Sequence, residues 1–239
     1  MSIVNDLGHL TVEQIEDIEK LTLRWLVQAT LDFGIEAYDI FKYSPDNVKD
    51  VAEDITREIT ERLAGYNLSQ RVFGTVDYKK ARYIILPDKI VRQALFLDSK
   101  AENSESSATL QISQTSMEIR QIKKGASVTV QGQVPTIYRH DGSQFLSTTV
   151  FLHYHYEDVE GVHQLKSIIA CCVPNGILQN IYNPSHTEGF WNIGRDSPER
   201  GEDFRVRVSF AKLKKLANWR VQKIVINSDE RKLVHVWDD

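Results

Sequence analysis

The sequence lacks the features of a secreted or membrane-bound protein. No apolar run reaches the length of a membrane-spanning helix, and residues 1–6 do not resemble a signal peptide. The two cysteines, Cys171 and Cys172, are neighbours on an expected strand, so they point to opposite faces and lack zinc-ligand spacing. We therefore expect a cytoplasmic protein with no membrane partner and with both cysteines in its core.

The 239 residues also lack internal repeats, low-complexity tracts and an overall excess of basic charge. The net charge of −4 argues against a protein that coats nucleic acid without selectivity. The charge is divided, however, because residues 1–61 hold five Lys/Arg against 14 Asp/Glu, whereas residues 195–224 hold nine Lys/Arg against four Asp/Glu. This division predicts a polyanion-facing surface near the C-terminal end, although a solvated helix face explains part of it.

Hydrophobic periodicity predicts both helices and strands. Thr11 and Gln14 form a capping box before a long helix that runs towards Phe41, and Ser44-Pro45 is expected to start a second helix that ends at Gly65. Two further helices are expected at 108–121 and 211–217. The expected strands cover residues 71–86, 90–99, 127–130, 145–156, 165–173, 204–210, 220–226 and 233–236.

Two aspartates and a lysine stand out among these strands. Asp98 follows the apolar run 94–97, and Lys100 lies two positions later, so both side chains share one strand face. If Pro87-Asp88 is a two-residue loop, Asp77 faces Asp98 across an antiparallel pair, and another loop register moves this pairing by a residue or two. Facing carboxylates repel each other, and a divalent cation between them removes the repulsion.

This arrangement is typical of metal-dependent phosphodiester hydrolysis. A Mg²⁺ ion acidifies a bound water and stabilises charge on the phosphate, while Lys100 can hold the water and offset developing negative charge. Glu53, beside the apolar stripe of the second helix, could serve as an outer carboxylate. The D-x-K pattern is short, however, and charges that mark the solvent end of a strand are the alternative interpretation.

Arginines on a later strand suggest a partner. Arg205 and Arg207 alternate with Val206 and Val208, so both arginines project from one face. Arginine matches the acceptors of guanine in the major groove, and the preceding loop adds Arg195, Asp196 and Arg200. An exposed strand face with salt bridges to Glu199, Glu202 or Asp203 is the alternative.

Histidines on the strand at 145–156 offer a second candidate metal site. His153 and His155 share a face there, as two metal ligands would. No third ligand stands at a suitable spacing, so partly buried sheet histidines are favoured.

These segments together resemble the SfiI family of type II restriction endonucleases and, more distantly, BglI. The matching segments occur in order through most of the chain: E-x-x-x-x-E-K-x-T-L-R (13–24), A-E-D-I-T (52–56), D-Y-K (77–79), L-D-S-K-A (97–101), T-L-Q-x-S-Q (109–114), L-K-S-I (165–168), Y-N-P (182–184) and S-P-x-R-G-E-x-x-R-x-R-V (197–208). Such an ordered series is far more specific than D-x-K alone.

The resemblance implies an α/β PD-(D/E)xK fold, a mixed β-sheet flanked by helices, in a Mg²⁺-dependent enzyme acting on double-stranded DNA. It implies catalytic residues at Asp77, Asp98, Lys100 and, less directly, Glu53, and metal-binding positions at Asp77, Asp98 and Ser99. DNA contacts are implied at Arg195, Asp196, Ser197, Arg200, Arg205 and Arg207. We expect one domain over 1–239, with a helical part (1–65), a catalytic core (66–125) and a sheet extension carrying the recognition elements (126–239).

The implied activity is cleavage of both strands at an interrupted palindrome containing G·C pairs, which requires a homodimer or homotetramer. The chain departs from the family where Val76 replaces the motif proline, at Ile112, and at Gly194-Arg195-Asp196, so we expect a different recognition sequence. Two alternatives are a structure-specific repair nuclease and a non-catalytic DNA-binding protein.

Overall fold

The computed structural model describes residues 7–44, 47–64, 68–71, 81–85, 92–194 and 204–239, with only the backbone of 62–64, 68–71 and 81–85. The helices are η1 (Leu7–His9), α1 (Val12–Tyr43), α2 (Val48–Ala64), η2 (Ile112–Gln114), η3 (Gly176–Leu178), α3 (Gln179–Tyr182), α4 (Phe210–Leu216) and η5 (Asn218–Arg220). The first seven strands are β1 (Leu68–Arg71), β2 (Ala81–Ile85), β3 (Gln93–Glu102), β4 (Ser107–Gln111), β5 (Ile119–Lys123), β6 (Ala126–Val130) and β7 (Ile137–His140). The remaining strands are β8 (Ser143–Val159), β9 (Val162–Val173), β10 (Trp191–Ile193), β11 (Arg205–Ser209), β12 (Val221–Asn227) and β13 (Lys232–Val234).

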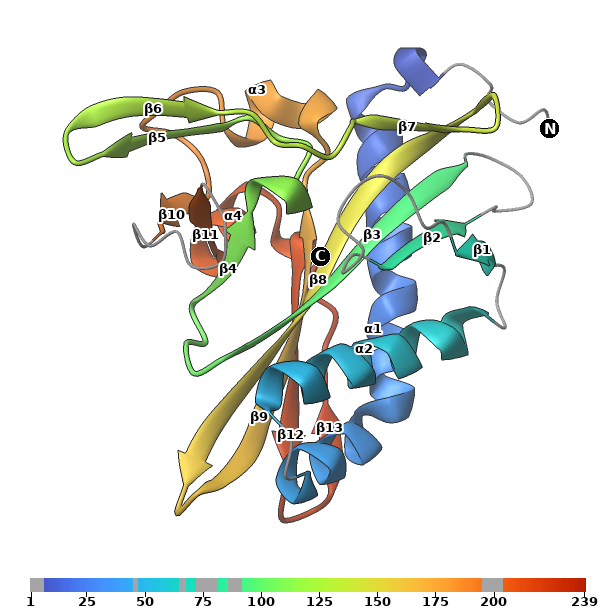
Figure 1. The fold of residues 1–239 in the computed structure, drawn as a ribbon, viewed down its shortest axis with the longest axis vertical. Coiled ribbons are helices and arrows are strands. Elements are labelled where there is room, and N and C mark those ends of the chain that lie inside the picture. The colour runs from blue at the N-terminus through green and yellow to red at the C-terminus, as the bar shows by residue number, and fades with distance from the viewer. Residues whose placement is uncertain (1–6, 45–46, 65–67, 72–80, 86–91, 195–203) are drawn as a thin grey trace.

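A mixed sheet forms the centre of the molecule, as the sequence predicts. Its strand order is β1-β2-β3-β8-β9-β12-β13, with β7 paired to β8. The β3–β8 pair is parallel, and the other pairs of this sheet are antiparallel. A second sheet has the order β10-β11-β4, and β5 pairs with β6 in a hairpin that projects from the molecule (Figure 1).

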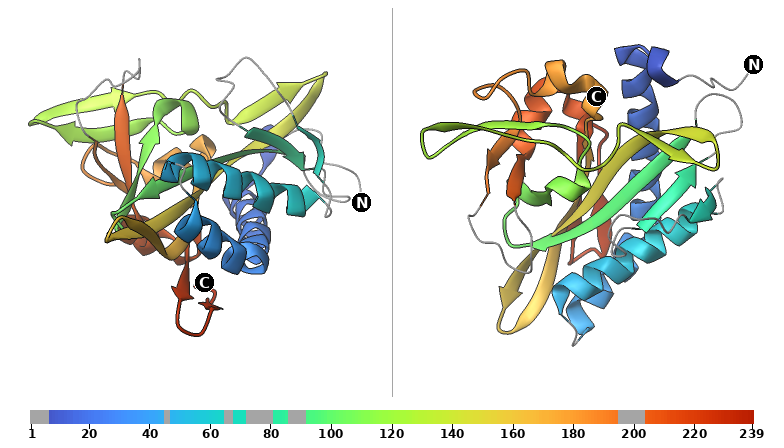
Figure 2. Two further views of the ribbon diagram at one scale, coloured as in Figure 1. Left: turned by 60° about the horizontal axis from the view of Figure 1, so that its bottom comes forward. Right: turned by 45° about the horizontal axis from the view of Figure 1, so that its top comes forward.

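Two cores lie on opposite faces of the large sheet. Helices α1 and α2 pack side by side over one face, and the β10-β11-β4 sheet with α4 lies on the other side of the long strands β3 and β8 (Figures 1 and 2). Cys172 belongs to the helix-side core and Cys171 to the opposite core, both as free buried thiols. The prediction that the two cysteines face opposite ways inside the protein is therefore confirmed.

The N-terminal helices follow the sequence closely, with one exception at their junction. The capping box is confirmed, because Gln14 N donates to Thr11 Oγ1 (3.2 Å) and Thr11 N donates to Gln14 Oε1 (2.8 Å). Ser44, predicted to start α2, is instead the C-cap of α1. Asn47 fills the capping role at α2, since its side chain accepts from Lys49 N at 3.0 Å and its carbonyl accepts from Val51 N at 3.1 Å. No described helix is long and apolar enough to cross a membrane.

The predicted helix at 108–121 is wrong. This stretch contains β4, the short turn η2 and the start of β5. Ala108 and Leu110 are buried, as the alternation of a half-buried strand requires, and β4 pairs antiparallel with β11. Met117 is buried as predicted, but Ile122 is exposed. Pairing with a distant strand has overridden the local pattern.

The strand predicted at 71–86 is β1 and β2, paired antiparallel, and residues 72–80 between them lie outside the described part. The predicted register between this stretch and β3 is also wrong. Ala81 pairs with Leu97, a shift of three residues from the register that would place Asp77 opposite Asp98. The predicted Pro87-Asp88 loop lies in residues 86–91, outside the described part of the chain.

The other predicted strands are confirmed to within a few residues, as is the helix at 211–217, which is α4. The long hairpin of β8 and β9 occupies the middle of the sheet, with β3 on one side and β12 on the other. Strands from residue 68 to residue 234 share this sheet, so the expected catalytic core and sheet extension are joined by hydrogen bonding.

Candidate active site

Strand β3 separates apolar and polar side chains by its alternation. Leu95 and Leu97 are buried against the helix-side core, whereas Asp98 and Lys100 project from the opposite face. The prediction that Asp98 and Lys100 share a face is confirmed by their contact, with Lys100 Nζ 2.7 Å from Asp98 Oδ2. Side-chain exposure is 15% for Lys100 and 25% for Asp98, so the pair is sheltered and still reachable from solvent.

Gln114 joins this pair from the end of η2. Its Nε2 donates to Asp98 Oδ2 at 2.6 Å, and its Oε1 accepts from Lys100 Nζ at 3.1 Å. Both contacts to Asp98 therefore end on one carboxylate oxygen, Oδ2. The predicted helix at 108–121 gives no indication of this role. The T-L-Q-x-S-Q match at 109–114 was the available signal in the sequence.

A second charged pair lies further along β3. Glu102 Oε2 contacts Arg207 Nη2 at 2.7 Å, and Glu102 Oε1 accepts from Thr109 N at 2.9 Å. Arg207 also donates to Ser107 Oγ (2.9 Å), Ser107 O (2.8 Å) and Thr109 Oγ1 (3.0 Å). Burial raises the pKa of Glu102, but the Thr109 amide and the Arg207 charge outweigh it, so this pKa lies below its ordinary value of 4.5. Strand β11 is thereby tied to the strand that carries Asp98.

The arginine strand has the predicted alternation. Val206 and Val208 are fully buried, while Arg205 and Arg207 lie on the other face and are partly exposed. Among the described residues, the acidic partner of Arg207 is Glu102. Glu199, Glu202 and Asp203, the salt-bridge partners that the sequence suggests, lie outside the described residues.

Among the described residues, no three His, Cys, Asp or Glu side chains gather around a common point. His153 is fully buried, its Nε2 lies 2.8 Å from Ser104 O, and burial lowers its pKa to about 4. His155 is partly exposed, with Nδ1 3.8 Å from Glu105 Oε1. One histidine of β8 thus lies in the core and the other at a partly exposed position, and the preference for sheet histidines over metal ligands stays a prediction.

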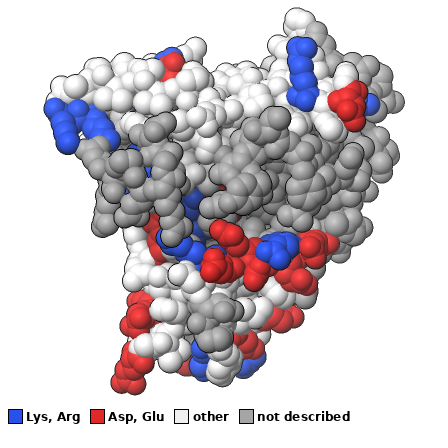
Figure 3. All heavy atoms as spheres, viewed as in Figure 1, with Lys and Arg blue, Asp and Glu red and all other residues white. Residues whose placement is uncertain are grey.

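Several predicted site residues are not described. Asp77 lies in the segment 72–80, and Arg195, Asp196, Ser197 and Arg200 lie in 195–203. Glu53 is exposed on α2, which packs its apolar stripe on the face of β3 opposite to Asp98. Figure 3 shows acidic side chains gathered over this helix.

The described donors suit a hard divalent cation. Asp98 keeps Oδ1 clear of the hydrogen bonds that converge on Oδ2, and a carboxylate oxygen is what such cations prefer. Ser99, the third predicted metal position, lies between Asp98 and Lys100 on β3 and is partly buried. Lys100 supplies a fixed positive charge beside this oxygen, as hydrolysis of an anionic ester requires.

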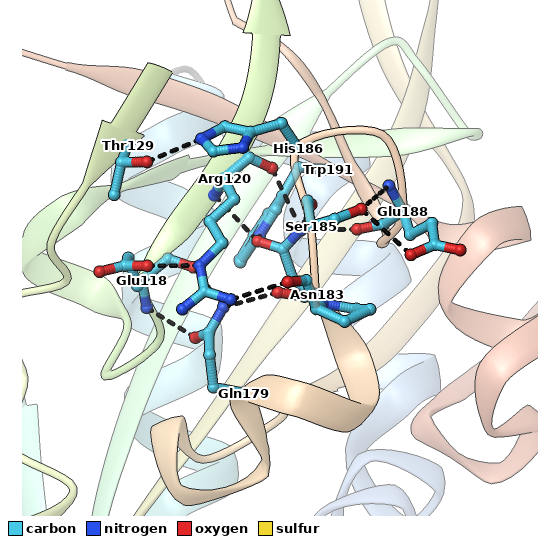
Figure 4. A network of polar contacts seen from close by, with 10 residues as sticks. Glu118, Arg120, Thr129, Gln179, Asn183, Ser185, His186, Glu188 and Trp191 are labelled. Atoms are coloured by element: carbon cyan, nitrogen blue, oxygen red, sulfur yellow. Dashed lines mark hydrogen bonds and ion pairs between the residues drawn. The ribbon is translucent and has the colours of Figure 1, made fainter. Parts of the chain in front are cut away.

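A separate polar pocket of ≈ 360 Å³ lies between β5 and the loop that follows α3. Asn183 organises this loop (Figure 4): its Oδ1 accepts from Arg120 N and Trp191 Nε1, and its Nδ2 donates to three backbone carbonyls, those of Arg120, Ser185 and Glu188. The Y-N-P segment that contributed to the resemblance therefore has a structural role here.

Three comparisons with known proteins point to the same family. Residues 29–224 match the family model described as type II restriction enzyme SfiI. The type II restriction enzyme SfiI of Streptomyces fimbriatus is 34% identical over 249 aligned residues, covering 98% of this chain and 93% of that protein. The crystal structure of tetrameric restriction endonuclease SfiI bound to cognate DNA has a TM-score of 0.83 and 30% identity, covering 98% of this chain and 97% of that one. The chain, which brings Gln114 of η2 into contact with Asp98 and Lys100 of β3, belongs to the SfiI family of type II restriction enzymes.

Proposed function

We propose that the chain hydrolyses phosphodiester bonds in both strands of double-stranded DNA with Mg²⁺ as the cofactor. The observation that carries the proposal is the sheltered Asp98–Lys100 contact at 2.7 Å, in a chain that matches a restriction enzyme over 98% of its length. Asp98 and Lys100 are the proposed catalytic pair, with Asp77 as a second acidic residue and Glu53 as an outer one. Asp77, Asp98 and Ser99 are the proposed metal-binding positions.

Each described residue has a distinct part in the reaction. A bound Mg²⁺ would acidify a water molecule and stabilise negative charge on the phosphate. Asp98 would offer Oδ1 to the cation, while its Oδ2 contacts the ammonium of Lys100. Lys100 orients the attacking water and offsets the negative charge that develops on the phosphate oxygens.

Recognition of a sequence is assigned to the neighbouring strand and loop. Arg205 and Arg207 are proposed to read guanine in the major groove, helped by Arg195, Asp196, Ser197 and Arg200. The contact between Glu102 and Arg207 joins β11, which carries the proposed reading residues, to β3, which carries the proposed catalytic pair. We propose an interrupted palindromic site containing G·C pairs, and a different site from that of SfiI because of the departures at Ile112 and 194–196.

Assembly and location follow from this activity. A palindrome cut in both strands requires two copies of the site related by two-fold symmetry, so a homodimer is the minimum. The solved SfiI structure is a tetramer bound to cognate DNA, and we propose that this chain also forms a homotetramer on DNA. We propose that the protein is located in the cytoplasm, where it would meet DNA that enters the cell.

Incubation of the purified protein with a fully sequenced plasmid and Mg²⁺ tests the proposal. We expect discrete fragments whose ends define one short sequence. The Asp98→Ala variant should bind the same DNA in Ca²⁺ and leave it uncut. A smear of products, cutting that follows DNA structure rather than sequence, or no cutting by the wild type would contradict the proposal.

A further inference from the structure

The Asp98–Lys100 pair is held by a third side chain whose chemistry is matched to both partners. Gln114 faces a carboxylate with its Nε2 (2.6 Å) and an ammonium with its Oε1 (3.1 Å). Lysine only donates and an ionised carboxylate only accepts, so this orientation of the amide satisfies both contacts and the reverse orientation satisfies neither. Together with the direct Asp98–Lys100 contact, the three side chains form a closed triangle.

Gln114 is itself firmly placed. Its side chain is nearly buried, and its Oε1 also accepts from Gln111 N at 3.0 Å. The surrounding backbone is bonded to a second segment, through Gln133 N to Ile112 O (2.8 Å) and Val134 N to Thr115 O (3.0 Å). A buried amide with three polar contacts has little rotamer freedom, so it transmits a fixed geometry to the pair.

Two glycines allow this close backbone packing. A Cβ at Gly132 would lie 2.4 Å from Thr115 O, and a Cβ at Gly176 would lie 2.3 Å from Ser116 O. Both distances are far inside contact with backbone atoms, which cannot move aside as a flexible side chain can. The backbone that follows Gln114 is therefore in close contact with two other segments, at Gly132 and at Gly176.

From these contacts we infer that Gln114 is a positioning residue of the cleavage site. It holds Asp98 by Oδ2, so that Oδ1 could serve a cation, and it gives the Lys100 ammonium a second acceptor. This inference rests on the proposed function, since it concerns how the same catalytic pair is oriented. Groups that orient metal ligands in this way typically contribute about 10-fold to 100-fold to metal affinity or activity.

The test compares Gln114→Met with the wild type. Methionine keeps the length and volume of the side chain and removes its three polar contacts, with Asp98, Lys100 and Gln111 N. We expect the Mg²⁺ concentration for half-maximal cleavage to rise and the single-turnover rate to fall by about 10-fold to 100-fold. DNA affinity measured in Ca²⁺ at a saturating concentration should stay unchanged. Gln133→Met, an exposed change close to the same segment, is the matched control and should cleave as the wild type does.

The Gln114→Glu variant gives a readout that a purely structural role would not produce. A protonated glutamic acid can donate to Asp98 and accept from Lys100 as the amide does, whereas an ionised one repels Asp98. The ratio of variant to wild-type cleavage rate should therefore fall as pH rises through the pKa of the new carboxyl group.

The outcomes distinguish a failure of the Gln114 inference from a failure of the proposed function. If the wild type cleaves, Asp98→Ala does not, and Gln114→Met keeps the wild-type rate and Mg²⁺ dependence, the inference on Gln114 is overturned and the proposed function stands. A constant Gln114→Glu to wild-type ratio across pH also overturns it. If the wild type fails to cleave DNA under any divalent cation, the proposed function itself fails.

Discussion

At the scale of single residues, alternation along β3 arranges three charged side chains in a row. Asp98, Lys100 and Glu102 project from one face. Asp98 and Lys100 pair with each other and with Gln114 of η2, whereas Glu102 pairs with Arg207 of β11. Glu102 also accepts from the backbone amide of Thr109. The charge of Glu102 therefore joins two strands, whereas the charge of Asp98 is proposed to serve the reaction.

The lowered pKa of Glu102 makes this joint sensitive to acid. A carboxyl group whose pKa is lower in the folded than in the unfolded protein stabilises the fold above its unfolded value, here 4.5, and this contribution is lost as pH falls through the folded pKa. Glu102→Gln should therefore lower the free energy of unfolding at pH 7 by about 1–2 kcal/mol. Urea denaturation at several pH values measures the difference from the wild type. The difference should shrink below pH 4.5, and one that stays constant would contradict a role for the charge.

At the scale of secondary-structure elements, a buried ion pair fastens α1 to the C-terminal half of the chain. Arg220, fully buried in η5, lies 2.8 Å from Glu19 of α1, and its guanidinium stacks at 4.3 Å from the rings of both Tyr182 and Trp219. Glu19 also accepts from Asn175 N at 2.8 Å. The buried charge of Arg220 is tolerated because the Glu19 carboxylate and the two aromatic rings compensate it.

Removal of one partner should be costly for this reason. Arg220→Met leaves Glu19 buried without its cation, and we expect a loss of about 3–5 kcal/mol in the free energy of unfolding at neutral pH. The double variant Arg220→Met/Glu19→Gln removes the stranded charge and keeps an acceptor for Asn175 N. It should be more stable than Arg220→Met alone in urea denaturation, and a double variant that is no more stable would argue against the ion pair.

At the scale of the whole molecule, acidic and basic residues are separated. The helix pair that covers one face of the sheet carries most of the acidic excess, and the basic excess of residues 195–224 lies beyond β10 in sequence, around β11 and α4. Double-stranded DNA is a polyanion, so this separation favours its approach to the side of the sheet that holds Asp98, Lys100 and β11.

The proposed oligomeric state can be measured without a cleavage assay. One chain has a mass of 27.4 kDa, and the proposed homotetramer has about four times that mass. Sedimentation equilibrium in the absence of metal, with and without a short duplex carrying the mapped site, distinguishes the states. A dimer would contradict the proposed homotetramer and remain compatible with cleavage of both strands. A monomer on DNA would contradict the requirement for two-fold symmetry.

Features that depend on local periodicity were determined by the sequence itself. The capping box at Thr11, the shared face of Asp98 and Lys100 and the alternation around Val206 all follow from a repeat of 3.6 or 2 residues. The same rule placed the two cysteines on opposite faces of β9.

Other features were decided only by the tertiary structure. The stretch 108–121 is compatible with a helix by composition, and it forms β4, η2 and β5 because β11, nearly a hundred residues later, supplies the hydrogen-bonding partner. That pairing brings Gln114 to Asp98 and Glu102 to Arg207, contacts that no spacing in the sequence encodes. The register of β2 on β3 likewise differs from the one that the local pattern predicted. Local side-chain direction is set residue by residue, whereas partners distant in sequence are chosen by which strands pair, and that choice belongs to the folded chain as a whole.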